Sequence, residues 1–311
     1  MNWILLAVGA QFINAFVSLV DKHIISDEKT LPRPFVYAFY TCLISGVWIV
    51  VYFIGLLPFV PEALQIPSFE NVVEPTLEVV ALSFLAAYTF FTALVAMFTA
   101  LREYDASDVI PVIGSVSALG SFGLGYYFFH TTLSNNFILG IALLSVGTFL
   151  VSRLRFPFKT ALIALYSGLF FALHYITLKG LFASTSFDNG FFWSRIAFMF
   201  FAVTLLMIPN YFDRIKEQTK KTSKATAVLV FSNKILAGVS TILILKATDL
   251  GDVAVVQALG GLQFVFILIL GIFFSIRPTK LNIGEKYKRD TILKKVLFVA
   301  VITVGFLVLF K

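Results

Sequence analysis

The sequence contains little charge, little cysteine and little histidine. Only 13% of its 311 residues are Asp, Glu, Lys or Arg, whereas soluble domains contain about 25%. A single cysteine, Cys42, excludes a disulfide within the chain and a multi-cysteine metal site. The three histidines, His23, His130 and His174, do not have the spacing of a metal-binding motif. These shortages argue against a soluble domain and against a metal-dependent enzyme.

Catalytic motifs are missing as well. The sequence has no GxxxxGKS/T phosphate-binding loop, no HExxH zinc motif and no GxSxG nucleophile elbow. We therefore predict that the protein is not an enzyme and needs no cofactor. The net charge of +7 comes mainly from basic loops between apolar segments, which suit an anionic lipid surface. Nucleic-acid binding is not expected, because the sequence shows no folded basic face.

Apolar segments dominate the sequence instead. Hydrophobic residues make up 59% of the chain, and its mean hydropathy is +0.92. A run of about 20 apolar residues crosses the ~30 Å hydrocarbon core as a helix, which satisfies its own backbone groups in lipid. The apolar windows and their charged or Pro/Gly/Asn-rich breaks predict an all-α integral membrane protein with ten transmembrane helices. These lie at about 2–21, 35–57, 76–101, 108–130, 136–152, 159–181, 189–211, 225–247, 252–275 and 292–310.

The distribution of Lys and Arg predicts the orientation of these helices. The loops after the odd-numbered helices carry most of the 24 basic residues, and cytoplasmic loops collect such residues. The longest loop on the other side contains Glu62, Glu70 and Glu74 and no basic residue. We therefore expect both termini outside, in a multi-pass protein of the cytoplasmic (inner) membrane of a prokaryote, with the lipid bilayer as its surroundings.

Two parts of the sequence resemble each other. The segment "LREYDASDVIPVI" at 101–113 aligns with "LKATDLGDVAVVQ" at 245–257, with identical residues at five positions and an offset of 144. A second match, at an offset of 157, aligns Lys22 of the first predicted helix with Lys179 of the sixth. The matches indicate an internal duplication.

The duplication divides the chain into two five-helix repeats, 1–155 and 156–311. Because five is odd, the second repeat enters the membrane from the opposite side, as in secondary transporters built from inverted repeats. In the matching segments, Asp108 and Asp252 precede apolar helices. We expect both to be N-caps, since an aspartate accepts from free backbone donors and faces the positive end of the helix dipole.

Two motifs link the chain to a known family. The turn at 100–112 reads Ala-Leu-x-x-x-Asp-Ala-Ser-x-Val-x-Pro-Val, and the segment "NNFILGIALLSVGTFLVSR" contains two spaced glycines, Gly140 and Gly147. With these motifs the chain resembles the ten-helix, EamA-like branch of the drug/metabolite transporter (DMT) superfamily. The resemblance implies that helices 1–4 and 6–9 line a central cavity and that helices 5 and 10 lie at the periphery.

Ionisable residues inside the predicted helices are candidate substrate-binding residues, because each costs roughly 2.5–3.5 kcal/mol to place at the bilayer centre. Lys234 is the strongest candidate, since it lies about 14 Å into the eighth helix. Its neighbour Asn233 adds an amide. His174, Lys179 and Arg195 lie in the sixth and seventh helices. Together with Lys234 they predict a cationic lining, which suits a phosphate or carboxylate.

Each of these residues has a structural alternative. For Lys179 and Arg195 it is a side chain that extends to the outer interface. For His174, which we consider as a proton-sensitive group, it is a neutral ring bonded to a carbonyl. Asp21 and Lys22 end the first predicted helix, where we expect them to pair with each other or with water.

Uncharged polar and aromatic residues complete the predicted substrate-binding lining. They are Asn14, Ser18, Tyr40, Trp48, Tyr88, Tyr175, Trp193, Gln257 and Gln263. An amide that faces lipid has no hydrogen-bond partner. Gln257 and Gln263 are therefore each expected either to bind substrate or to bond to a neighbouring helix.

These features predict a secondary transporter of a small polar metabolite, anionic or zwitterionic, such as an amino acid or an organic phosphate or acid. The expected mechanism is alternating access, in which the two repeats move around the central cavity. The alternative is a passive channel or a lipid-handling protein on the same scaffold. The sequence leaves open the substrate, the transport direction, proton coupling against substrate exchange, and whether the protein forms a homodimer.

Overall fold

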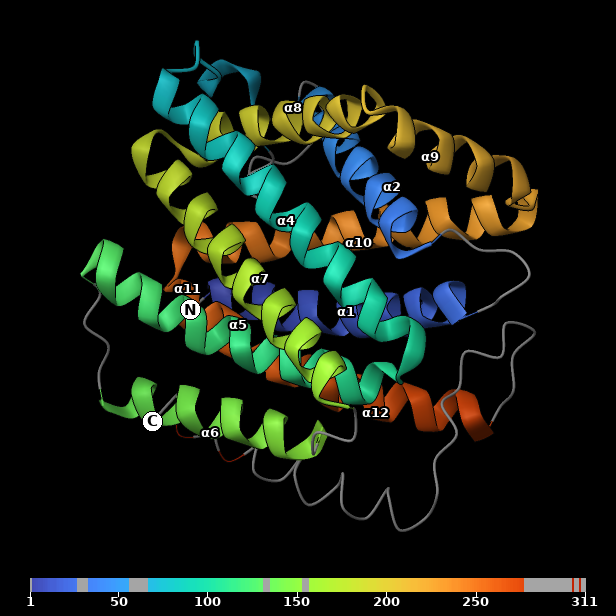
Figure 1. Ribbon diagram of the computed structural model, residues 1–311. Coiled ribbons are helices and arrows are strands. Elements are labelled where there is room, and N and C mark those ends of the chain that lie inside the picture. Colours follow the sequence, from blue (N-terminus) through green and yellow to red (C-terminus); the bar gives the residue numbers. More distant parts are fainter. Residues whose placement is uncertain are drawn as a thin grey trace.

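The computed structural model describes residues 2–26, 33–55, 67–130, 135–152 and 157–276, together with Val304 and Val308. The described segments form helices joined by turns (Figure 1). Among them, eight helical segments are long and apolar enough to cross a membrane. The protein is therefore an all-α, multi-pass membrane protein.

The helices follow one another with short connections. Up to residue 152 they are α1 (Asn2–Ser26), α2 (Pro34–Val47), η1 (Trp48–Val50), α3 (Val51–Gly55), η3 (Phe69–Asn71), α4 (Leu77–Glu103), α5 (Ala106–Phe129) and α6 (Asn135–Ser152). From residue 157 they are α7 (Phe158–Ser184), α8 (Phe187–Leu206), α9 (Pro209–Lys221), α10 (Lys224–Leu250), α11 (Val253–Ala258) and α12 (Gly261–Ile276).

The first nine predicted segments are helical, with their ends shifted by a few residues. Three differ in detail. The predicted helix at 35–57 is divided into α2, η1 and α3. The predicted helix at 189–211 ends at Leu206, and the predicted helix at 252–275 is broken into α11 and α12. The tenth predicted helix, at 292–310, lies outside the described residues apart from Val304 and Val308. The division into repeats at residue 155 stays a prediction.

Helix α9 occupies a segment that we expected to be a loop. Pro209 stands in its first turn, where the missing N–H costs nothing. Ile215 is buried, while the charged residues of α9 are exposed. This pattern is typical of a helix that lies along a membrane surface. The hydropathy pattern missed α9 because its apolar residues are few and fall on one face.

The turn between α4 and α5 corrects one of the two expected N-caps. The N-cap of α5 is Asp105, whose carbonyl accepts from the N–H groups of Asp108 and Val109 at 3.1 Å each. Asp108 therefore lies inside the first turn, and its assignment as an N-cap was wrong. Asp252 is confirmed as the N-cap of α11.

Lys22 and Lys179, which the sequence aligned, make the same kind of contact. Lys22 Nζ donates to the carbonyl of Leu101 at 2.8 Å, at the end of α4. Lys179 Nζ donates to three carbonyls at the end of α10, those of Thr248 at 2.9 Å, Asp249 at 2.7 Å and Gly251 at 3.2 Å. The last carbonyls of a helix have no partner within it. Each lysine supplies donors to such carbonyls.

Four helices form the centre of the bundle. α1 packs along α10, and α4 packs along α7 (Figure 1). α7 also packs against α5, and α1 against α12. α6 lies at one edge, against α5, α11 and α12. A cavity lies among the central helices.

Candidate functional site

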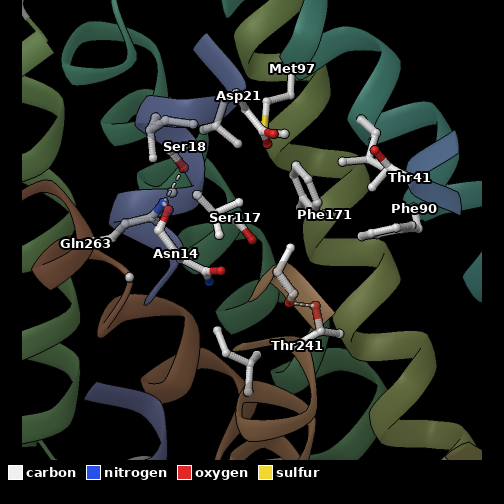
Figure 2. Close-up of a pocket in the computed structure, with 18 of the residues that line it drawn as sticks. Asn14, Ser18, Asp21, Thr41, Phe90, Met97, Ser117, Phe171, Thr241 and Gln263 are labelled. Atoms are coloured by element: carbon white, nitrogen blue, oxygen red, sulfur yellow. Dashed lines mark hydrogen bonds between the residues drawn. The ribbon is translucent and has the colours of Figure 1, made fainter. Parts of the chain in front are cut away.

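The cavity has a volume of about 170 Å³ and is surrounded by residues from eight helices, α1, α2, α4, α5, α7, α10, α11 and α12. It is smaller than the roughly 300–1,000 Å³ pockets of drug-sized ligands. Its lining includes the aromatic residues Phe90 and Phe171 on one side and polar residues of α1 on the other (Figure 2). A small, partly polar molecule suits this space.

The polar side of the cavity follows one face of α1. Gln11, Asn14, Ser18 and Asp21 all line the cavity. They are spaced by three or four residues, which places them in a row along a helix. At a rise of about 1.5 Å per residue, the row extends for roughly 15 Å. Gln11 thus lies at one end of this row and Asp21 at the other.

A buried ion pair forms one end of this row. Lys234 Nζ lies 2.8 Å from Asp21 Oδ1, and their side chains are only 3% and 6% exposed. Asn233 Nδ2 donates to the same oxygen at 2.6 Å, and the hydroxyl of Tyr37 also donates to it. The Lys234 ammonium lies 4.3 Å from the centre of the Tyr37 ring and 5.1 Å from that of Phe98, within the range of cation–π attraction.

The second carboxylate oxygen of Asp21 is not used in this network. All the hydrogen bonds that Asp21 receives from residues in the described ranges go to Oδ1. Asp21 and Lys234 nevertheless both line the cavity. A charged acceptor and a charged donor are thus available at the same wall.

The structure corrects the expectation for Asp21. It does not pair with Lys22, because Lys22 reaches to Leu101 instead. α1 continues to Ser26, so Asp21 lies more than a turn inside the helix. The pair with Lys234 makes this wall of the cavity neutral rather than cationic. The row of polar residues on α1 is the sequence signal that could have revealed it.

A second group of hydrogen bonds joins α1 to α10 and α12. Gln263 Nε2 donates to Ser18 Oγ at 2.9 Å, which Figure 2 shows, and to the carbonyl of Asn14 at 3.2 Å. Ser240 Oγ lies 2.6 Å from Asn14 Oδ1. Asn14, a predicted substrate-binding residue, is thus in the cavity wall but already bonded.

Gln257 also lies in the cavity wall. Its Oε1 accepts from Ser117 Oγ at 3.3 Å, which links α11 to α5. The break between α11 and α12 follows at Leu259 and Gly260, and Gly260 lines the cavity as well. Tyr175 of α7 is a further predicted residue in the lining.

Arg195 and His174 lie behind the wall rather than in it. Arg195 is 2% exposed and lies between the rings of Phe191 and Phe198, at 4.8 and 4.5 Å. It donates to the carbonyl of Ser45, a lining residue, at 3.3 Å. Within the described ranges no carboxylate pairs with it. His174 Nδ1 lies 2.9 Å from the carbonyl of Ala86.

The remaining predicted residues have other surroundings. Lys179 bonds to the end of α10. The Tyr40 hydroxyl pairs with that of Thr219 in α9. Trp48 packs on the backbone of Gly238. Tyr88 is 50% exposed on the outer face of α4. None of these four lines the cavity described above.

Replacing Lys179 with Met separates a structural from a substrate-binding role. The carbonyls at the end of α10 lose a charged donor, a type of hydrogen bond that contributes about 1.5–3 kcal/mol. We expect a lower melting temperature in detergent and an unchanged shift of that temperature by ligands. Lys221→Met, at a side chain 65% exposed, is the control. A loss of the ligand-induced shift in Lys179→Met alone would contradict the structural role.

Comparisons with known proteins report a fold but no family. No family model and no curated protein matches the sequence. A solved structure described only as "Crystal structure of protein" is similar over 99% of this chain and 96% of its own, with a TM-score of 0.65 and 13% sequence identity. At this identity the similarity shows a shared fold alone.

Proposed function

We propose that the protein is a secondary transporter of a small zwitterionic or anionic metabolite, such as an amino acid or an organic acid or phosphate, which it moves by alternating access. The observation that carries the proposal is the Asp21–Lys234 pair. Buried ionisable groups inside a membrane are costly and mark substrate or ion pathways. This pair lines a cavity among eight helices.

The charges favour a substrate with a carboxylate or phosphate. Lys234 binds such a group as a point charge, and the freed Asp21 accepts an ammonium group of the same molecule. Arg195, behind Ser45, adds a positive charge that has no carboxylate partner in the described segments. The surroundings of the cavity are thus net positive. A zwitterion replaces both partners of the ion pair, and an anion replaces one.

We also propose that the chain belongs to the EamA-like branch of the drug/metabolite transporter superfamily and that it consists of two inverted repeats. The equivalent contacts of Lys22 and Lys179 support the repeats. The edge position of α6 and the lining of the cavity by α1, α2, α4, α5, α7 and α10–α12 agree with the arrangement that the resemblance implies, whereas α8, the predicted seventh helix, contributes no residue to this lining. The basic loops support insertion into the cytoplasmic membrane with the end of α1 inside.

The Asp21–Lys234 network also suggests how substrate binding is linked to movement. It ties α1 to α10 and, through Tyr37, to α2. A substrate that binds Lys234 in place of Asp21 weakens this contact between the helices. The helix break at Gly260 provides a second point at which the wall can change shape, as in other transporters with interrupted helices.

A thermal-shift screen tests the proposal. Purified protein is heated with amino acids, organic acids, phosphate esters and nucleotides, and a ligand that binds the folded state raises the melting temperature. We expect a zwitterion or small anion to do so, and we expect Lys234→Met to abolish the shift. Lys221→Met, a lysine of exposed α9, should keep it. An unchanged shift in Lys234→Met, or stabilisation by lipids alone, would contradict the proposal.

A further inference from the structure

Two glutamines lie beside the cavity with unsatisfied amide groups. Gln11 is 4% exposed, and its Oε1 has no hydrogen-bond partner in the part of the chain that the structure describes. The same holds for Nε2 of Gln257. Both residues line the cavity. One acceptor and one donor are therefore without partners at its wall.

Such groups are uncommon in folded proteins. Nearly all buried polar side-chain atoms have a partner, and an unsatisfied one costs free energy. When the atoms lie next to a cavity, a molecule in the cavity can supply the partners. The ion pair differs from the two amides, because Asp21 and Lys234 already bond to each other.

Both glutamines lie next to the break between α11 and α12. Gln257 lies in the last turn of α11, and its carbonyl accepts from the N–H of Gly260 at 3.0 Å. A Cβ atom on Gly260 would lie 3.9 Å from Nε2 of Gln11. Gln11 of α1 therefore lies against the same break. Ser117 holds Gln257 through its Oε1, which leaves Nε2 for another partner.

The polar residues between the amides and the ion pair are already engaged. Asn14 Oδ1 pairs with Ser240, and Ser18 accepts from Gln263. Gln11 is ten positions from Asp21 on the same face of α1, roughly 15 Å along the helix axis. The buried side-chain atom of this row that has no partner in the described part of the chain thus belongs to Gln11 and not to the residues in the middle.

We propose that Gln11 and Gln257 form a subsite for a carboxamide or hydroxyl group of the substrate. Such a group is both donor and acceptor, as the two free atoms require. A carboxylate only accepts, an ammonium only donates, and a methyl group does neither. Since this inference rests on the proposed function, the substrate class becomes a zwitterion with an uncharged polar side chain.

Competition binding tests the subsite. Wild-type protein in detergent is titrated with L-glutamine, and with L-glutamate and L-norleucine as analogues of similar length that lack the required group. We expect L-glutamine to bind at least about tenfold more tightly than both analogues. Gln11→Met and Gln257→Met should each remove this preference while the affinity for L-norleucine stays the same. Gln218→Met, in α9, is the matched control and should keep it.

The outcomes separate the two proposals. If none of the three zwitterions nor any small anion binds the wild type, the proposed function fails and the subsite with it. If zwitterions bind without the preference, or if the folded Gln11→Met and Gln257→Met variants keep it, the subsite is wrong and the function stands. Should one variant not fold, the other decides.

Discussion

Asp21→Asn and Lys234→Met are each expected to destabilise the protein by about 3–5 kcal/mol, the usual cost of leaving one member of a buried ion pair without its partner. In Asp21→Asn the ammonium of Lys234 keeps only neutral partners. In Lys234→Met the Asp21 carboxylate keeps Tyr37 and Asn233 but loses its counter-ion. The double variant removes both charges, and we expect it to recover most of the stability without recovering binding.

Denaturant unfolding of the four proteins in lipid–detergent micelles measures this effect. The double variant separates the two roles of the pair, because a purely structural pair would restore binding together with stability. Glu217→Gln combined with Lys221→Met removes an exposed ion pair of α9 and should leave unfolding unchanged. Single variants that unfold like the wild type would show that Asp21 and Lys234 are not paired in the membrane.

Gly238→Ala is expected to produce the second large effect. A Cβ at this position would lie 1.6 Å from Nε1 and 1.9 Å from Cε2 of Trp48. Relieving such an overlap requires the bulky indole ring to leave its place against α10 or η1 to move away from this helix. Overpacking commonly costs about 1–3 kcal/mol, and we expect a value at or above the top of this range. Because Gly238 lines the cavity, ligand binding should fall as well.

The compensating change is Trp48→Ala. It removes the ring that meets the new methyl group, so Trp48→Ala combined with Gly238→Ala should be more stable than Gly238→Ala alone. Gly9→Ala is the control, since a Cβ there meets no atom within 4 Å. Melting temperatures measured by intrinsic fluorescence or light scattering are sufficient. A Gly238→Ala protein as stable as the wild type would show that Trp48 does not lie against α10.

The helices were largely predictable from the sequence because lipid imposes a simple rule. An apolar run of about 20 residues must be helical in a membrane, and the segments up to residue 276 follow it. This rule does not predict α9, because the exposed charged residues of this helix interrupt any apolar run. It also does not fix where a helix begins, which is why Asp108 rather than Asp105 was expected at the start of α5.

The lining of the cavity was predicted in part. Lys234 could be identified as a candidate from the sequence because a charged side chain deep in a membrane helix is costly and usually has a functional role. Its partner Asp21 is 213 positions away, on a helix that packs along α10, and no local pattern contains that pairing. Arg195 and His174 satisfied the same rule of depth, yet both lie behind the lining. Depth in the membrane is visible in the sequence, but the side of a helix that faces the cavity depends on its neighbours.

Counterflow in proteoliposomes tests the central claim most directly. Vesicles are loaded with the unlabelled zwitterion that stabilises the protein most, and the entry of labelled zwitterion is followed. The account predicts saturable uptake that is faster in loaded than in empty vesicles and is lost in Lys234→Met. Uptake that rises linearly with concentration and is indifferent to the zwitterion inside would contradict alternating access and would indicate a pore.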